Sequence, residues 1–89
     1  MIRANVIISN KLGLHARASA KFTKLAGTFR SEVSMARGER SVNAKSIMGV
    51  MMLAAGLGTE VQIEVAGEDE QHAMDALLAL INAKFGEAE

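Results

Sequence analysis

The chain has no cysteine among its 89 residues, which excludes disulfide bonds and thiolate metal sites. It also has no tryptophan or tyrosine and only three phenylalanines. Ten basic and ten acidic residues give a formal net charge of zero, and a neutral chain with so few aromatic rings is not expected to bind nucleic acid. No apolar run reaches the ~18 residues that a transmembrane helix needs, so we expect no membrane insertion. The lack of cysteine fits a cytoplasmic protein.

Proline is absent too, and no linker, low-complexity stretch or internal repeat divides the sequence. A chain of this length makes one domain, 1–89, which can bury roughly 60–65% of its unfolded surface. The first residues alternate like a strand and do not resemble a signal peptide.

Apolar and polar residues alternate in four segments, which predicts four strands. The first covers 2–9, and the second lies around 32–35. A hairpin turn at Gly38-Glu39 then leads into a short strand near 40–43. The clearest alternation, at 61–65, predicts the fourth strand.

Helical spacing predicts three helices between and after these strands. One covers 16–26 and stops at Gly27. A short helix runs from Ser46 to about Leu53, and a last helix begins with Asp69 as its cap. The apolar stripe of this last helix contains Met74, Leu77, Leu78, Ile81 and Phe85.

Each predicted strand has one polar face. Such strands suit an antiparallel sheet with one face in water and the helices packed on the other. The sequence therefore predicts an α+β fold of order βαββαβα, in which a four-stranded antiparallel sheet carries three helices on one face.

His15 lies where the first strand has ended and the first helix begins. The first backbone N–H groups of a helix lack intrahelical partners, and the helix dipole is positive there, so the end at Ala16 and Arg17 favours an anion such as phosphate. Arg17 adds a planar fork of donors that matches phosphate oxygens. A neutral imidazole beside these groups is a candidate acceptor of a phosphoryl group.

Two motifs resemble one known family. Residues 10–17, NKLGLHAR, are similar to the active-site motif of HPr, the histidine phosphocarrier of the bacterial phosphotransferase system. Residues 45–51, KSIMGVM, resemble the regulatory-serine segment of many HPr proteins. The resemblance covers nearly the whole chain and implies an open-faced β-sandwich with the phosphate on Nδ1 of His15. Ala18 departs from the proline that many members have there; alanine still favours a helix, so only fine positioning is affected.

The resemblance implies a phosphocarrier that is a stoichiometric intermediate rather than an enzyme and needs no cofactor or metal. Enzyme I would phosphorylate His15, and enzyme IIA domains would accept the group for sugar uptake. The expected protein is a monomer that docks transiently. Two alternatives stay open: a nitrogen-branch carrier of the NPr type, and a small regulatory binding module without phosphoryl transfer.

Ser46 is expected to cap the short helix. The resemblance adds a second role, phosphorylation by an HPr kinase/phosphorylase, which would place about −2 charge there. This helix is apolar on nearly all sides, which a small domain cannot bury. Val50 and Leu53 should point to the core, leaving an exposed docking patch. We call Ile47, Met48 and Met51 the methionine patch.

Three further residues are predicted to have structural roles or none in function. Gly13 allows a tight turn before the first helix, and Asn10 can brace that turn through its side chain. His72 lies among acidic residues in the last helix and is expected to be a solvated surface residue. His15 and His72 make no metal motif, because nothing supplies the remaining ligands.

Overall fold

The computed structural model describes residues 1–89 and has the predicted order of elements. The strands are β1 (Ile2–Ile7), β2 (Glu32–Arg37), β3 (Arg40–Asn43) and β4 (Glu60–Ala66). The helices are α1 (Ala16–Ala26), α2 (Ile47–Met52) and α3 (Glu70–Asn82), and a 3₁₀ turn, η1, covers Lys84–Gly86. The predicted bounds of the first helix agree with α1, and the other elements agree within a few residues.

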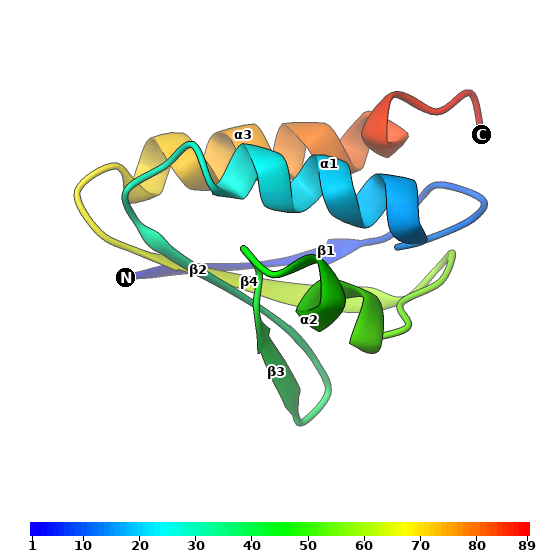
Figure 1. Ribbon diagram of the computed structural model, residues 1–89, viewed down its shortest axis with the longest axis horizontal. Helices are drawn as coiled ribbons and strands as arrows, with labels where there is room; N and C mark the ends of the chain where they lie inside the picture. Colours follow the sequence, from blue (N-terminus) through cyan, green and yellow to red (C-terminus); the bar gives the residue numbers. More distant parts are fainter.

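The four strands form one antiparallel sheet in the order β1-β4-β2-β3. The central strand β4 shows why the sheet has two different faces: Val61, Ile63 and Val65 are buried, whereas the residues between them are not. Figure 1 shows α1 and α3 side by side above the strands. Buried residues of all three helices join the inward face of the sheet in one apolar cluster, so the predicted one-sided packing is confirmed.

Phe85 belongs to this core, but the prediction that it lies in the last helix is wrong. The helix α3 ends at Asn82, and Phe85 lies in η1 with a positive φ of 58°. Its side chain is fully buried, and its carbonyl oxygen accepts a hydrogen bond from Lys21 Nζ at 2.7 Å. The turn therefore buries the ring while it sends the chain back toward the start of α1.

Two predicted helix ends also differ in detail. Gly27 does end α1, but it keeps right-handed helical angles (φ −66°) and does not use the left-handed conformation open to glycine. Asp69 does occupy the position before α3, yet its side chain caps no helical N–H. Its carboxylate instead accepts hydrogen bonds from the backbone N–H groups of Arg30 and Ser31, both at 2.9 Å, and from the Ser31 hydroxyl. Asp69 thus ties α3 to the segment before β2.

These bonds lower the pKa of Asp69 from 3.8 to about 2, the Ser31 hydroxyl contributing most and the Arg30 N–H next. Because the folded pKa lies below the unfolded one, the stabilisation is present above the unfolded pKa and disappears as the pH falls through the folded one. We expect Asp69→Asn to lower the urea midpoint by a constant amount above about pH 5 and by progressively less toward about pH 2. Asp75→Asn, an exposed change on α3, is the control. A difference in urea midpoint between Asp69→Asn and the unaltered protein that does not change with pH would contradict the low pKa of Asp69.

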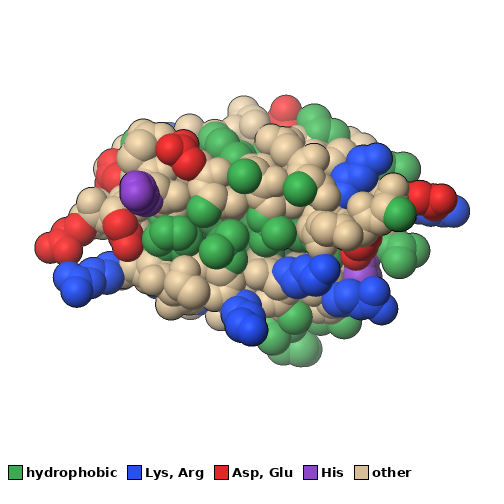
Figure 2. Space-filling model, turned by 90° about the horizontal axis from the view of Figure 1, so that it is seen from above, with side chains coloured by type: hydrophobic (Ala, Val, Ile, Leu, Met, Phe, Trp, Pro, Cys, Tyr) green, Lys and Arg blue, Asp and Glu red, His purple; other side chains and the backbone are tan.

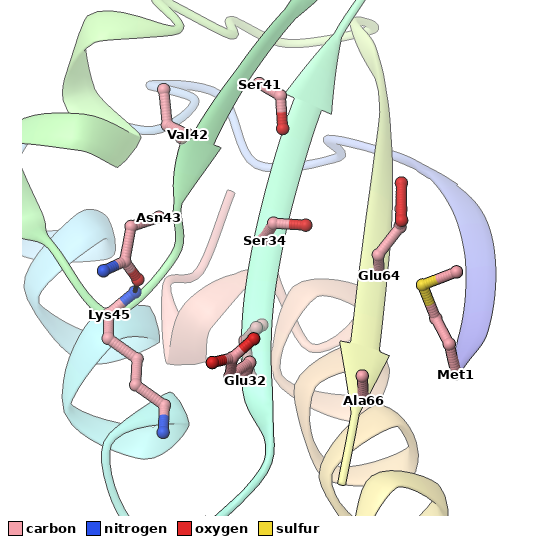
Figure 3. A pocket seen from close by; sticks show the side chains of 10 residues that line it. Met1, Glu32, Ser34, Ser41, Val42, Asn43, Lys45, Glu64 and Ala66 are labelled. Carbon is pink, nitrogen blue, oxygen red and sulfur yellow. Dashed lines mark hydrogen bonds between the residues drawn. The ribbon is translucent and has the colours of Figure 1, made fainter.

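The face of the sheet opposite the helices is open. A hollow of about 580 Å³ lies there over β2, β3 and β4, and Figure 3 shows side chains such as Glu32, Ser34 and Glu64 around it. No residue of the predicted site around His15 lines this hollow. None of the helices has the length and apolar character needed to cross a membrane.

Candidate functional site

The loop between β1 and α1 is held by hydrogen bonds on both sides of its turn. Asn10 Nδ2 donates to the carbonyl oxygen of Gly13 at 2.8 Å, which confirms the predicted brace. The next N–H, of Leu14, donates to the Ala55 carbonyl oxygen at 2.9 Å, and the buried Ser19 hydroxyl donates to the Leu14 carbonyl at 3.1 Å. The sequence did not indicate this role of Ser19. Together the bonds fix the backbone immediately before His15.

Gly13 confirms the predicted tight turn and adds a close contact. Its φ is +66°, a conformation that costs little only for glycine. A Cβ atom here would lie 2.6 Å from the Ala55 carbonyl oxygen and 2.6 Å from the Cα of Gly56. The missing side chain is therefore what lets the loop after α2 approach the loop that carries His15.

His15 itself is the N-cap residue of α1, with extended backbone angles (φ −72°, ψ 178°). Its carbonyl oxygen accepts the first helical bond, from Ser19 N–H at 2.9 Å, but its ring caps nothing. The N–H groups of Ala16 and Arg17 point out of the helix end without intrahelical acceptors. The imidazole is 25% exposed, so it lies at the surface beside the positive end of the helix.

An acidic residue that the sequence analysis did not single out contacts this ring. His15 Nε2 and Glu87 Oε2 are hydrogen-bonded, and the other carboxylate oxygen, Oε1, accepts from Asn10 Nδ2 at 3.0 Å. Asn10 is fully buried. The Asn10 amide, followed by the His15 ring, lowers the pKa of Glu87 below its usual value of 4.5, so the carboxylate stays ionised near neutral pH.

The C-terminal segment brings Glu87 to this position. After η1 the chain runs beside residues 10–12, where Lys11 N–H donates to the Glu89 carbonyl at 2.8 Å and Lys11 Nζ lies 3.4 Å from a Glu89 carboxylate oxygen. Figure 1 places the C-terminus at the same end of the molecule as the loop between β1 and α1. Acidic residues at the end of a chain are usually solvated, so no local pattern pointed to this contact.

A hollow of about 410 Å³ lies beside the imidazole. Its lining consists of Lys11, Leu12, His15, Arg17, Glu87, Ala88 and Glu89. Arg17 is exposed and its side chain makes no hydrogen bond or ion pair, so its guanidinium is available to an incoming anion. Figure 2 shows several Lys and Arg side chains toward one end of the helix-covered face, with apolar side chains next to them.

The short helix α2 has the cap and the inward face that were predicted. Ser46 is the N-cap residue, and its hydroxyl oxygen accepts a hydrogen bond from Gly49 N–H at 3.1 Å. Val50 and Leu53 are buried in the core. The Ser46 hydroxyl therefore lies at the start of the helix whose outer side carries the methionine patch.

The methionine patch is exposed, as predicted. Ile47, Met48 and Met51 have exposed fractions of 45%, 69% and 37%. Five further large apolar side chains are exposed and were not part of the prediction; they are Met1, Ile7, Leu12, Met52 and Leu57. Leu12 lines the hollow beside His15, so exposed apolar surface occurs at the candidate site as well as on α2.

The second histidine, His72, lacks the acidic partner and the neighbouring cations that surround His15. His72 is exposed in the first turn of α3, and its side chain makes no hydrogen bond or ion pair. No three His, Asp or Glu side chains are grouped so that they could hold a metal ion.

Comparison with known proteins agrees with this fold. Residues 2–83 match the family described as "PTS HPr component phosphorylation site". The phosphocarrier protein HPr of Cupriavidus necator is 65% identical over all 89 residues of both chains. The crystal structure of HPr-C-His from Thermoanaerobacter tengcongensis covers all of both chains with a TM-score of 0.96 and 43% identity. These are phosphocarriers, and this chain belongs to the HPr family of the phosphotransferase system.

The comparisons bear on the nitrogen-branch alternative and on the expected monomer. A phosphocarrier protein NPr of Shewanella violacea is also similar, but at a lower 42% identity over 87 residues, so the nitrogen-branch alternative is not better supported. A crystal structure described as an HPr dimer from Thermoanaerobacter tengcongensis aligns with a TM-score of 0.79. The expected monomer therefore stays a prediction for this chain.

Proposed function

We propose that His15 accepts a phosphoryl group from phosphorylated enzyme I and passes it to enzyme IIA domains for sugar uptake. The observation that carries this proposal is the partly exposed imidazole at the start of α1, beside a hollow that Arg17 and Lys11 also line. Phosphoryl transfer needs positioning and stabilisation of charge on the phosphoryl oxygens, which a helix end and a guanidinium supply. The chain acts as a single cytoplasmic domain, 1–89, and as a monomeric intermediate rather than an enzyme.

Incubation with enzyme I and labelled phosphoenolpyruvate tests this proposal. We expect one acid-labile, alkali-stable phosphate per chain, which a sugar-specific IIA domain then removes. Discharge by a nitrogen-branch IIA domain alone would instead favour the NPr-type carrier. A chain that takes up no label would be a regulatory binding module, and the proposal would be wrong.

Arg17 is proposed to hold the phosphoryl oxygens during transfer, together with the N–H groups of Ala16 and Arg17. Replacing Arg17 by alanine should slow transfer by more than about tenfold, because a charge-assisted bond contributes about 1.5–3 kcal/mol. Lysine should restore only part of the rate, since it lacks the planar fork. Lys24→Ala, which removes an exposed charge from the last turn of the same helix, is the control for both rates. Unchanged kinetics in Arg17→Ala would show that the helix end suffices.

We further propose that the methionine patch docks enzyme I and IIA domains, and that phosphorylation of Ser46 by an HPr kinase/phosphorylase blocks it. Met48→Asp should keep the melting temperature, because an exposed substitution usually changes stability by no more than about 0.5 kcal/mol. It should weaken partner binding measured by calorimetry, since a carboxylate must be desolvated against an apolar surface. Ser46→Asp should act in the same direction, but more weakly.

The matched control is Ala79→Asp, which adds the same charge to an exposed position on α3, outside the patch. It should leave partner binding unchanged. Equal weakening by Met48→Asp and Ala79→Asp would indicate a general charge effect and not a docking patch.

A further inference from the structure

We infer that Glu87 is a positioning residue: its carboxylate holds the proton of His15 on Nε2 and so leaves Nδ1 as the nitrogen that forms the bond to phosphorus. This inference rests on the proposed function of His15. Glu87 lies beyond the segment 2–83 that matches the family.

The direction of the hydrogen bond follows from the chemistry of the two groups. An ionised carboxylate only accepts hydrogen bonds, so the nitrogen facing it must carry the proton. That nitrogen is Nε2 of His15. No hydrogen bond engages Nδ1. A neutral imidazole with its proton on Nε2 has its lone pair on Nδ1, and this edge is the one left for a phosphoryl donor.

Asn10 fixes Glu87 in turn. Its Nδ2 donates both to Gly13 O and to Glu87 Oε1, whereas its own Oδ1 is buried without a partner. A flipped amide would put an oxygen against two acceptors, so only one orientation is compatible with this pair. A buried polar atom without a partner is costly, and the site tolerates it to keep the amide N–H groups on the loop and on Glu87.

The backbone of the turn before Glu87 is also held in one conformation. Lys84, Phe85 and Gly86 have successive positive φ values of 57°, 58° and 78°. Such angles persist in non-glycine residues only where the surroundings enforce them. Here the buried Phe85 ring and the Lys21 bond to the Phe85 carbonyl do so. The contact between Glu87 and His15 is thus the outcome of an anchored turn and not of a loose chain end.

The transfer step explains why a carboxylate is useful at Nε2. The Nδ1 lone pair forms the N–P bond while the bond from phosphorus to the donor's leaving atom breaks, and its electron pair stays with that atom. The proton on Nε2 does not move. The ring gains positive charge in this step, and the carboxylate of Glu87 faces that charge from the edge opposite the phosphoryl group. On discharge the N–P electron pair returns to Nδ1.

Two variants of Glu87 test whether its carboxylate holds the ring proton of His15 or stabilises the positive charge of the ring, and a third variant is their control. Glu87→Gln keeps an acceptor oxygen but removes the charge, and Glu87→Ala removes both. Glu89→Gln is the matched control, because Glu89 lies in the same tail but pairs with Lys11 and not with the ring. Nitrogen-15 NMR of the proteins alone identifies the ring nitrogen that carries the proton and whether a bond protects that proton from exchange.

In the unaltered protein we expect a protected proton on Nε2 and, after transfer, phosphorus on Nδ1. The ring proton should stay protected in Glu87→Gln and lose protection in Glu87→Ala. With enzyme I, kcat should fall by about 10-fold to 100-fold in both variants, the range found for residues that orient metal-binding imidazoles through their second ring nitrogen. KM for the carrier should stay within about twofold, because Glu87 acts on the reacting ring and not on docking. Glu89→Gln should match the unaltered protein.

A proton on Nδ1 in the unaltered protein, or an unchanged kcat in Glu87→Ala, would overturn the inference. A raised KM with constant kcat would also overturn it, because it would show that the tail serves docking or structure alone. The NMR measurement needs no phosphoryl donor. An unaltered protein that takes up no label therefore refutes the proposed function separately, while the position of the proton is still measured.

Discussion

The His15→Ala variant is expected to take up no phosphate from enzyme I and labelled phosphoenolpyruvate, whereas His72→Ala is expected to take up as much as the unaltered protein. The two histidines differ in every feature that phosphoryl transfer needs. His15 has a helix N-terminus and the free guanidinium of Arg17 beside it, while His72 is exposed among acidic residues and contacts no cation.

Loss of stability does not account for the expected loss of label. The His15 ring is partly exposed and lies outside the apolar core, so its removal leaves the packing of α1 unchanged. Circular dichroism and thermal melting of His15→Ala should therefore show the same fold. Label on the folded His15→Ala protein would place the phosphate elsewhere, and label lost from His72→Ala would contradict the choice between the two histidines.

The elements of this fold were predictable because their signals are local. The alternation at 61–65 and the helical spacing over 16–26 each lie within one segment of the chain, and β4 and α1 followed them. The exposed methionine patch was predictable for a related reason. A short helix with apolar residues on all sides cannot bury them all in so small a protein, and Met48 is indeed 69% exposed.

Local rules failed where a distant donor competes with a local one. Asp69 precedes a helix and has the side chain of a good cap. Its carboxylate nevertheless accepts hydrogen bonds from the backbone N–H of Arg30 and from the backbone N–H and hydroxyl of Ser31. These donors lie on a segment 38 residues away or more, and the tertiary fold alone brings them near. Phe85 is a second case. It continues the helical spacing of α3, but the helix already ends at Asn82, and Lys21 from α1 binds the Phe85 carbonyl oxygen.

The candidate site shows both outcomes together. His15 and Arg17 are neighbours in a motif, so their proximity was predictable from the sequence. Glu87 lies 72 residues from His15, and its approach depends on the turn at Lys84–Gly86 and on the buried Asn10 amide. The sequence motif places only positive groups around the imidazole. The structure adds a carboxylate, which changes the expected chemistry from simple attraction of an anion to orientation of the ring.

Gly13→Ala is expected to destabilise the protein by at least about twice as much as Gly38→Ala, although the two glycines have nearly the same φ, +66° and +60°. A left-handed conformation costs an alanine about 1–2 kcal/mol at either position. Only at Gly13 would the new Cβ also meet backbone, 2.6 Å from the Ala55 carbonyl oxygen; at Gly38 nothing lies within 4 Å. Overpacking of this kind typically adds about 1–3 kcal/mol.

The difference between the two variants therefore isolates the close approach of the loops. Each 1 kcal/mol should lower the melting temperature by about 4–8 °C in a domain of this size, so thermal melting resolves it. Gly38→Ala should transfer phosphate at the unaltered rate. Gly13→Ala should also transfer more slowly, because relief of the clash moves Ala55 away from the Leu14 N–H that fixes the backbone before His15. Equal melting temperatures for the two variants would mean that the loops separate freely, and the Leu14–Ala55 bond would then have no part in placing the imidazole.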